Sequence, residues 1–185
     1  MPDSMIGRWA PLYEGMTERR AYGVYSPTYQ AAAEWLTPCV SVEDWGAGGG
    51  WFAKFLHQGQ LYTAVDGTAN PYADVVADLT SYRPVTKPEG ILLRHVAEHN
   101  LQWRAIIDNL LASFTKRAVV VVYTPFTDEP THDLGDDASG LRVPTISFNY
   151  DEFFDALQPI HRVWEYHGPE CGHYGTETVF ELGQP

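Results

Sequence analysis

The turn DWGAGGG, residues Asp44–Gly50, decides the fold of this chain, because it joins a strand-like run to a helical run. The strand-like run is VSVEDW, which ends at Trp45, and the helical run is WFAKFLHQ, which begins at Trp51. Glycine suits such a turn, since the backbone must bend sharply, adopt a positive φ and let a ligand approach without a Cβ in the way. The helix that follows would add unpaired N–H groups, so the turn predicts a ligand-binding loop.

Strand-like and helical runs alternate beyond this turn. In order they are LYTAVDG, VVADL, GILLRHV, WRAIIDNLLASF and AVVVVYT. This alternation predicts parallel strands joined by crossovers, and the run 119–122, apolar on both faces, predicts a central strand with helices on both sides. A further helix is expected at 150–157. The last strand-like runs, 161–167 and 174–182, flank a short turn at Gly168-Pro169 and predict an antiparallel hairpin.

The length of 185 residues, 44% of them apolar, fits one domain, 1–185, with a substantial core. We expect the core at 38–185 and an aromatic-rich segment at 1–37, which ends in a helix at 29–36 with Ser26-Pro27 as its cap and first turn. This segment either packs on the core or forms a lid over a substrate. Its aromatic residues include Trp9, Tyr13, Tyr22, Tyr25 and Tyr29.

The composition argues against several classes of function. The formal net charge is −12 and the 12 Lys and Arg residues are scattered, so a long nucleic acid is not an expected partner. No apolar run approaches the roughly 20 residues that span a bilayer, and the N-terminus lacks the pattern of a signal peptide. We therefore expect a cytoplasmic protein without a membrane segment. Cys39 and Cys171 give no disulfide framework, and the sequence leaves the oligomeric state open.

Two carboxylates follow later strand-like runs. Asp66-Gly67 comes about 20 residues after the glycine turn, where an acid at the end of a second strand can accept from both ribose hydroxyls of a nucleoside cofactor. Asp78 precedes a loop, where it is suited to accept from an adenine amino group while Leu79 covers the ring. A nicotinamide dinucleotide is the competing ligand, but its GxGxxG fingerprint requires Gly or Ala where this chain has Trp51.

The motifs EDWGAGGG, YTAVDG, VVADL and GILLRHVAEHN, in this order and spacing, resemble the successive motifs of the class I S-adenosylmethionine-dependent methyltransferases. The resemblance covers about 39–126. It implies an α/β, Rossmann-like fold with a mostly parallel seven-stranded sheet, helices on both faces and a C-terminal antiparallel hairpin. It also implies S-adenosylmethionine as cofactor and S-adenosylhomocysteine as product. The residues it assigns to the methionine side, the ribose and the adenine, in turn, are Asp44, Gly46, Gly48 and Gly50; Asp66 and Gly67; and Asp78 and Leu79.

The run RHVAEHN carries the candidate catalytic residues, His95 and His99, since this family brings residues to the methyl group after the fourth strand. An imidazole titrates near neutrality and suits a general base or a group that positions the acceptor. The alternative is that His95, Glu98 and His99 only order the loop and helix start. The same residues match the H-x-x-E-H zinc pattern, but no third ligand is evident and no metal is expected.

Two polar clusters lie outside these motifs. The first, in the predicted hairpin turn, either touches the acceptor or is an ordinary polar turn, and its spacing matches no standard zinc site. Its members are His167, Glu170, Cys171 and His173. The second is the irregular acidic segment 127–144, which either attracts a divalent cation or a cationic acceptor or is a solvated loop. Its acidic and histidine residues are Asp128, Glu129, His132, Asp133, Asp136 and Asp137.

The sequence thus predicts methyl transfer from S-adenosylmethionine to a small-molecule or sugar-like acceptor. The Asn/Asp-Pro-Pro-aromatic and Pro-Cys motifs of DNA methyltransferases do not occur beside 93–99. Two alternatives stay open. One is a regulatory protein that binds S-adenosylmethionine without turnover. The other is a nicotinamide-dependent oxidoreductase, against which Trp51 and the short chain stand.

Overall fold

The computed structural model describes residues 7–13, 26–135, 141, 143–169, 171 and 174–184. Within them, seven strands form one sheet and two short strands form another. The strands are β1 (Ser41–Trp45), β2 (Leu61–Asp66), β3 (Val75–Val76), β4 (Gly90–Arg94), β5 (Arg117–Val122), β6 (His132–Asp133), β7 (Ile146–Ser147), β8 (Ile160–His167) and β9 (Thr176–Gly183). The helices are α1 (Ala10–Tyr13), α2 (Pro27–Trp35), α3 (Trp103–Leu111) and α4 (Tyr150–Ala156), with 3-10 helices η1 (Trp51–Lys54) and η2 (Ala97–His99).

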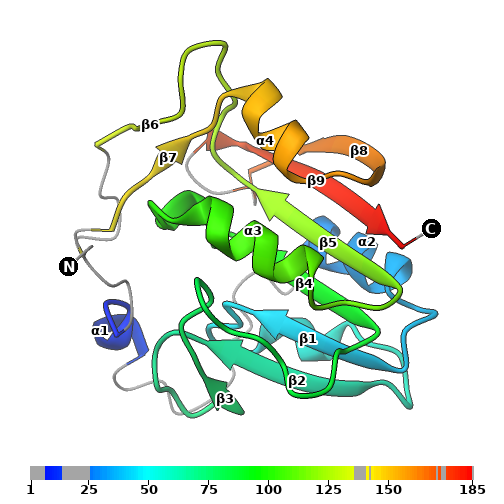
Figure 1. The fold of residues 1–185 in the computed structure, drawn as a ribbon. Helices are drawn as coiled ribbons and strands as arrows, with labels where there is room; N and C mark the ends of the chain where they lie inside the picture. The colour runs from blue at the N-terminus through cyan, green and yellow to red at the C-terminus, as the bar shows by residue number, and fades with distance from the viewer. Residues whose placement is uncertain are drawn as a thin grey trace.

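The main sheet has the strand order β3-β2-β1-β4-β5-β9-β8. Strands β1 to β5 are mutually parallel where they pair, and β9 runs antiparallel to both of its neighbours, β5 and β8. In Figure 1 the arrow of β9 points opposite to the arrows of β1, β2 and β5. The predicted mostly parallel seven-stranded sheet with a C-terminal antiparallel hairpin is confirmed. This topology brings the carboxyl ends of β1 to β5 and the start of β9 to one edge.

Helices cover both faces of the sheet, as Figure 1 shows for α3 in front and α2 behind. Strand β5 explains this arrangement, because its side chains alternate between two cores. Val120 and Val122 join the core under α3 and α4, whereas Val119 and Val121 join the core under α2 and η1. All four are buried, so the expected central strand with two apolar faces is confirmed. Ser26 caps α2 as expected, since its hydroxyl accepts from the N–H of Tyr29.

The predicted helix WFAKFLHQ is wrong, because only the 3-10 turn η1 forms there. Gly50, which precedes this turn, has a left-handed φ of 65° and supplies no side-chain cap. The three aromatic residues of this run also have weaker helix propensity than its Ala53, Lys54 and Leu56. Phe52 anchors the segment instead, since it is fully buried and stacks on Tyr29.

Two other segments differ from expectation. The connection from β8 to β9 runs from 168 to 175 and is longer than the predicted short turn. The acidic segment 127–144 is not wholly irregular, because β6 pairs with β7. Asp133 orders the turn after β6, since its Oδ1 accepts from the N–H groups of Gly135 and Thr145 at 2.9 and 3.1 Å. Asp136 and Asp137 lie outside the described residues.

No helix in the described part of the chain is both long enough and apolar enough to cross a membrane.

Candidate functional site

The glycine turn lies at the carboxyl end of β1 and is held by backbone hydrogen bonds to the neighbouring strand. The N–H groups of Gly46 and Ala47 both donate to the carbonyl of Val65, at 2.8 and 3.1 Å. Gly46 and Gly48 have left-handed φ values of 78° and 53°. A Cβ on Gly46 would lie 2.2 Å from Cγ2 of Val96, so a larger residue does not fit there. The turn thereby brings bare backbone to the sheet edge, as the sequence predicts.

Asp66 lies beside this turn at the end of β2. Its Oδ2 accepts from the N–H of Gly48 and its Oδ1 from the N–H of Thr68, both at 2.8 Å. The carboxyl is buried, and burial raises its pKa while the two N–H groups act in the opposite direction. A carboxylate has about four acceptor positions, so both oxygens keep capacity for ligand hydroxyls while they hold the turn in place.

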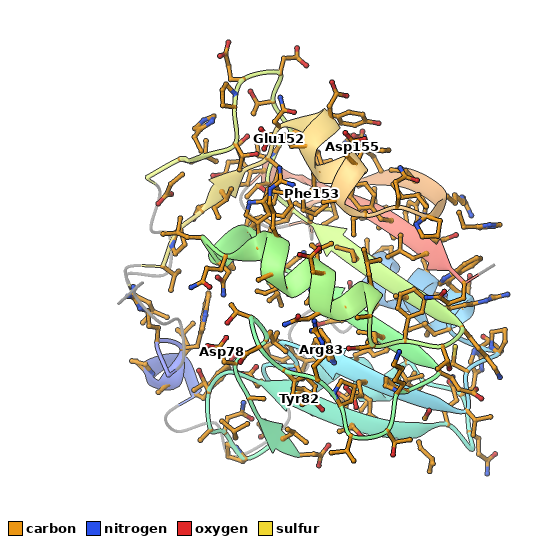
Figure 2. The ribbon with its side chains drawn as sticks, in the orientation of Figure 1. Asp78, Tyr82, Arg83, Glu152, Phe153 and Asp155 are labelled. Carbon is orange, nitrogen blue, oxygen red and sulfur yellow. The ribbon has the colours of Figure 1, made fainter. Side chains whose placement is uncertain are left out.

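Asp78 and Leu79 follow β3 and form the next part of the site. Asp78 Oδ1 accepts from the N–H and the hydroxyl of Thr80, at 2.9 and 2.7 Å. Leu79 is buried, and its carbonyl accepts from Nδ2 of Asn109 in α3 at 2.7 Å. Figure 2 shows Asp78 on the side of the sheet toward which the arrow of β2 points. The loop is therefore held at the sheet edge by the hydrogen bonds of Asp78 with Thr80 and of Leu79 with Asn109.

Asp44 lies beneath the turn, within β1. Its side chain is buried, and Oδ2 accepts from the Tyr62 hydroxyl at 2.8 Å. Burial raises the pKa of Asp44 to about 7, with the nearby Asp66 carboxylate adding to the rise. Asp44 and Gly50 do not line the cavity described next. They can therefore affect a ligand only by supporting the glycine turn.

A cavity of about 590 Å³ opens over the sheet edge and is bounded by most of the predicted site residues. Gly46, Gly48, Asp66, Gly67, Asp78, Leu79, His95 and His99 all line it. The remaining lining residues are Trp9, Leu12, Tyr13, Tyr29, Ala47, Trp51, Arg94, Val96, Asn100, Ile106, Tyr123 and Cys171. The cavity is therefore lined by residues of all four predicted motifs, by residues within 9–13 near the N-terminus and by Cys171 in the connection between β8 and β9.

The described part of the aromatic N-terminal segment contributes to the cavity wall. Trp9, Leu12 and Tyr13, in or beside α1, line it. Burial and the nearby Asp66 carboxylate raise the pKa of Tyr13, so its hydroxyl stays protonated at neutral pH. These positions fit both alternatives for the segment, packing on the core and forming a lid. Tyr22 and Tyr25 lie outside the described residues.

His95 follows β4 and lies against a buried acid that its own motif does not predict, Glu177 of β9. His95 Nε2 lies 3.0 Å from Glu177 Oε1, and the guanidinium of Arg94 donates to the same oxygen at 2.6 Å. Thr28 of α2 donates to the other oxygen, Oε2. His95 has an unusual left-handed φ of 55°, a conformation that costs about 1–2 kcal/mol outside glycine.

The surroundings of this cluster shift the pKa values of Glu177 and His95, so that Glu177 is ionised and His95 is neutral at pH 7. Burial opposes ionisation of Glu177, but His95 and Arg94 outweigh it and lower the pKa of the acid to about 2. Burial and the Arg94 charge lower the pKa of His95 to about 4, so the imidazole is neutral at pH 7. A base with so low a pKa accepts protons weakly near neutrality.

His99 occupies a different environment at the end of η2. Its Nδ1 lies 2.9 Å from the carbonyl oxygen of Pro144, and its Nε2 lies 3.1 Å from the hydroxyl of Tyr123. A carbonyl only accepts, so we assign the proton to Nδ1, which leaves Nε2 as the acceptor for the Tyr123 hydroxyl. Trp9 packs edge-on against the imidazole, with ring centroids 5.0 Å apart.

The zinc alternatives gain no support from the described residues, among which no group of three His, Cys, Asp or Glu side chains could hold a metal ion. Glu98 of the H-x-x-E-H run is fully buried, and its Oε1 accepts from the N–H of Tyr123 at 3.1 Å. Burial raises the pKa of Glu98 to about 7. In the second cluster, Cys171 lines the cavity while His167 is exposed on β8. Its other members, Glu170 and His173, lie outside the described residues.

Comparison with known proteins places this architecture. No protein-family model matches the chain, and no curated protein matches it in sequence. Solved structures do match. A 1,6-didemethyltoxoflavin-N1-methyltransferase from Burkholderia thailandensis, with its acceptor and S-adenosylhomocysteine bound, superposes with a TM-score of 0.70 at 17% identity, over 95% of this chain and 85% of that chain.

Two further structures with bound S-adenosylhomocysteine superpose similarly. The N-methyltransferase NodS from Bradyrhizobium japonicum gives a TM-score of 0.62 at 11% identity, over 97% of this chain and 99% of that chain. Magnesium protoporphyrin IX methyltransferase from Synechocystis gives 0.62 at 15%, over 85% and 82%. The chain therefore has the fold of the class I S-adenosylmethionine-dependent methyltransferases, as its motifs predict.

Proposed function

We propose that this protein transfers a methyl group from S-adenosylmethionine to a small-molecule acceptor. The observation that carries the proposal is the convergence of Gly46, Gly48, Asp66, Asp78 and Leu79 on one cavity at the carboxyl edge of the sheet. Open parallel sheets bind their ligands at this edge. The similar structures, which hold S-adenosylhomocysteine, support the same cofactor here.

The residues present fit this cofactor. The cavity of about 590 Å³ lies within the range of roughly 300–1,000 Å³ that small-molecule sites occupy. At Gly46 a Cβ would clash with Val96, so the backbone on the methionine side has no room for a side chain. Asp66 would accept from the ribose hydroxyls, and Asp78 with Leu79 would hold the adenine. Asp44 supports the turn from below through its place in β1.

Bound S-adenosylmethionine supplies an electrophilic methyl group on a sulfonium. The protein's task is to align an acceptor lone pair with that methyl group and to exclude water. His95, neutral and held by Glu177, is suited to orient the acceptor rather than to take its proton. His99, whose Nε2 is directed at Tyr123, is the better candidate for a base. The acceptors of the similar enzymes, which include a toxoflavin precursor and a magnesium porphyrin, favour a small molecule for this chain as well.

Equilibrium dialysis with tritiated S-adenosylmethionine tests the cofactor. We expect S-adenosylhomocysteine to displace the label and NAD not to. Asp66→Ala should weaken binding at least about tenfold, because a lost hydrogen bond to a charged group costs about 1.5–3 kcal/mol. Asp108→Ala is the control, since Asp108 is exposed on the outer side of α3. Displacement by NAD, or no binding of either adenosyl compound, would overturn the proposal.

A turnover assay separates an enzyme from a regulatory protein that only binds the cofactor. Label from [methyl-³H]-S-adenosylmethionine should appear in an organic acceptor when the protein is incubated with a broad panel of small molecules. Cofactor binding without transfer to any panel member would favour the regulatory alternative.

A further inference from the structure

The half of the cavity at the ends of β4 and β5 has a composition of its own. The side chains there include the aromatic rings of Trp9, His95, His99 and Tyr123, together with Val96, Arg94 and Asn100. Aromatic rings follow one another along this wall. The Tyr123 ring centroid lies 4.8 Å from that of His95 and 5.6 Å from that of His99, which in turn contacts Trp9 at 5.0 Å. Such a wall offers flat faces and ring edges to a flat ligand.

The positive charge in this half of the cavity is already paired with a carboxylate. Arg94 is the cation among the described lining residues, and its guanidinium is paired with Glu177 and also lies over the Tyr29 ring, 4.3 Å from its centroid. A phosphate or carboxylate on the acceptor would have to compete with a buried carboxylate for this guanidinium. The wall therefore favours an uncharged aromatic ligand.

Tyr123 and His99 add a specific proton path to this wall. Pro144 fixes the imidazole with its proton on Nδ1, so the Nε2 lone pair faces the Tyr123 hydroxyl at 3.1 Å. The phenol then donates to His99, and a phenol oxygen can also accept, here from a ligand in the cavity that Tyr123 lines. A phenol oxygen both donates and accepts, which suits it to pass a proton from one partner to the other.

We propose that this half of the cavity binds a flat aromatic or heteroaromatic acceptor with an acidic O–H or N–H, and that Tyr123 passes the acceptor's proton to His99. This proposal rests on the proposed methyltransferase function. The acceptor's proton moves to Tyr123 Oη as the Tyr123 proton moves to His99 Nε2. The acceptor lone pair forms the bond to the methyl carbon, and the carbon–sulfur bond breaks with its electrons left on sulfur. His99 ends as an imidazolium, with Nδ1–H still directed at Pro144.

Several ionisable groups surround this pair. At the end of β4, the His95 ring lies beside the Tyr123 ring, and both His95 and Arg94 contact Glu177 of β9. From η2, Glu98 accepts from the Tyr123 backbone N–H. His99 therefore takes up the proton, and the Glu177 carboxylate neutralises the charge of Arg94.

A coloured acid tests the proton path without turnover. The probe is 4-nitrophenol, a flat phenol whose absorbance distinguishes its acid and anion, bound to protein saturated with S-adenosylhomocysteine. Below the pH at which the free dye is half ionised, we expect the bound dye to show the spectrum of its anion. Tyr123→Phe and His99→Gln should each abolish that spectrum, and either variant suffices if the other fails to fold.

Matched controls accompany these variants. Tyr150→Phe changes an exposed tyrosine on α4, and His132→Gln changes an exposed histidine whose Nδ1 also lies 2.9 Å from a proline carbonyl, that of Pro130. Both should leave the dye spectrum unchanged. All variants should keep their affinity for S-adenosylhomocysteine, which separates a failure of this proposal from a failure of the proposed function.

Transfer rates give the second test, with a panel of phenols and N–H heteroaromatics of graded acidity. Tyr123→Phe should slow transfer by about 10²–10⁴-fold, the usual contribution of general base catalysis. The loss should shrink for acceptors that are already ionised in the assay, which a merely structural role would not produce. The proposal is overturned if S-adenosylhomocysteine binds but the dye does not, if wild type and Tyr123→Phe ionise the dye equally, or if no panel member is methylated.

Discussion

Replacing Glu177 by Gln should destabilise the protein strongly, because this carboxylate joins three elements. It accepts from Arg94 of β4 and from Thr28 of α2, and it faces His95 after β4. Its side chain is only 2% exposed, and that of Arg94 is 14% exposed. The variant keeps the shape of the side chain but leaves the Arg94 guanidinium with no counter-charge at this position.

Two independent estimates give the size of the loss. Breaking a buried ion pair by removing one partner costs about 3–5 kcal/mol. Lowering a carboxyl pKa from 4.5 to about 2, as the surroundings of Glu177 do, corresponds to about 3 kcal/mol of stability at neutral pH. The folded pKa lies below the unfolded one, so this stabilisation is complete above about pH 4.5 and is lost as the pH falls through about 2. The difference between wild type and Glu177→Gln should shrink accordingly in acid.

Urea unfolding at several pH values measures this effect. The matched control is Glu165→Gln, which removes an exposed acid that lies 3.3 Å from His167 on β8 and should cost less than about 1 kcal/mol. In the double variant with Arg94→Met, much of the penalty should disappear, because no unpaired charge is left inside. A loss below about 1 kcal/mol for Glu177→Gln, or one equal to that of the control, would refute the reasoning.

Two further variants test the cofactor edge. Gly46→Ala should cost about 2–4 kcal/mol and weaken S-adenosylhomocysteine binding, since left-handed strain adds to the 2.2 Å clash with Val96. Gly59→Ala, with φ of 96° and open space around it, should show the strain alone, and equal losses in urea unfolding would contradict the clash. Asp44→Asn should flatten the stability–pH profile: the wild-type carboxyl pKa is raised from 3.8 to about 7, so its stabilisation is lost as pH rises through that range. Unfolding at pH 5 and pH 8 checks this, and a variant that gains nothing on wild type at pH 8 would contradict it.

The sequence could predict which residues meet at the proposed cofactor side of the cavity because each of its parts is a local motif. The glycine turn, Asp66 and Asp78 each follow a strand, and parallel topology alone brings strand ends to one edge. The structure places Gly46, Gly48 and Asp66 within one hydrogen-bonded turn, and Asp78 against the same cavity. Sequence spacing is enough for such sites, since the fold that aligns them is specified by hydrophobic pattern.

The acceptor side was harder to predict because its contacts are remote in sequence. Arg94 and Glu177 pair across 83 positions, and the motif that contains Arg94 gives no hint of its partner. The available signal was the presence of two acids, Glu177 and Glu181, in the strand 176–183, both of which become buried. Tyr123 was also missed, since its role depends on where η2 directs His99. The wrongly predicted helix at 51–58 has a similar cause, because tertiary burial of Phe52 fixes that segment.

A crystal structure of the protein with S-adenosylhomocysteine tests the central claim most directly. We expect the ligand to lie in the cavity at the ends of β1 to β4, with its ribose hydroxyls within hydrogen-bond distance of Asp66 and its adenine against Leu79. Its sulfur should point toward His95 and Tyr123. Ligand bound elsewhere on the molecule, or with its ribose away from Asp66, would contradict the proposed cofactor site.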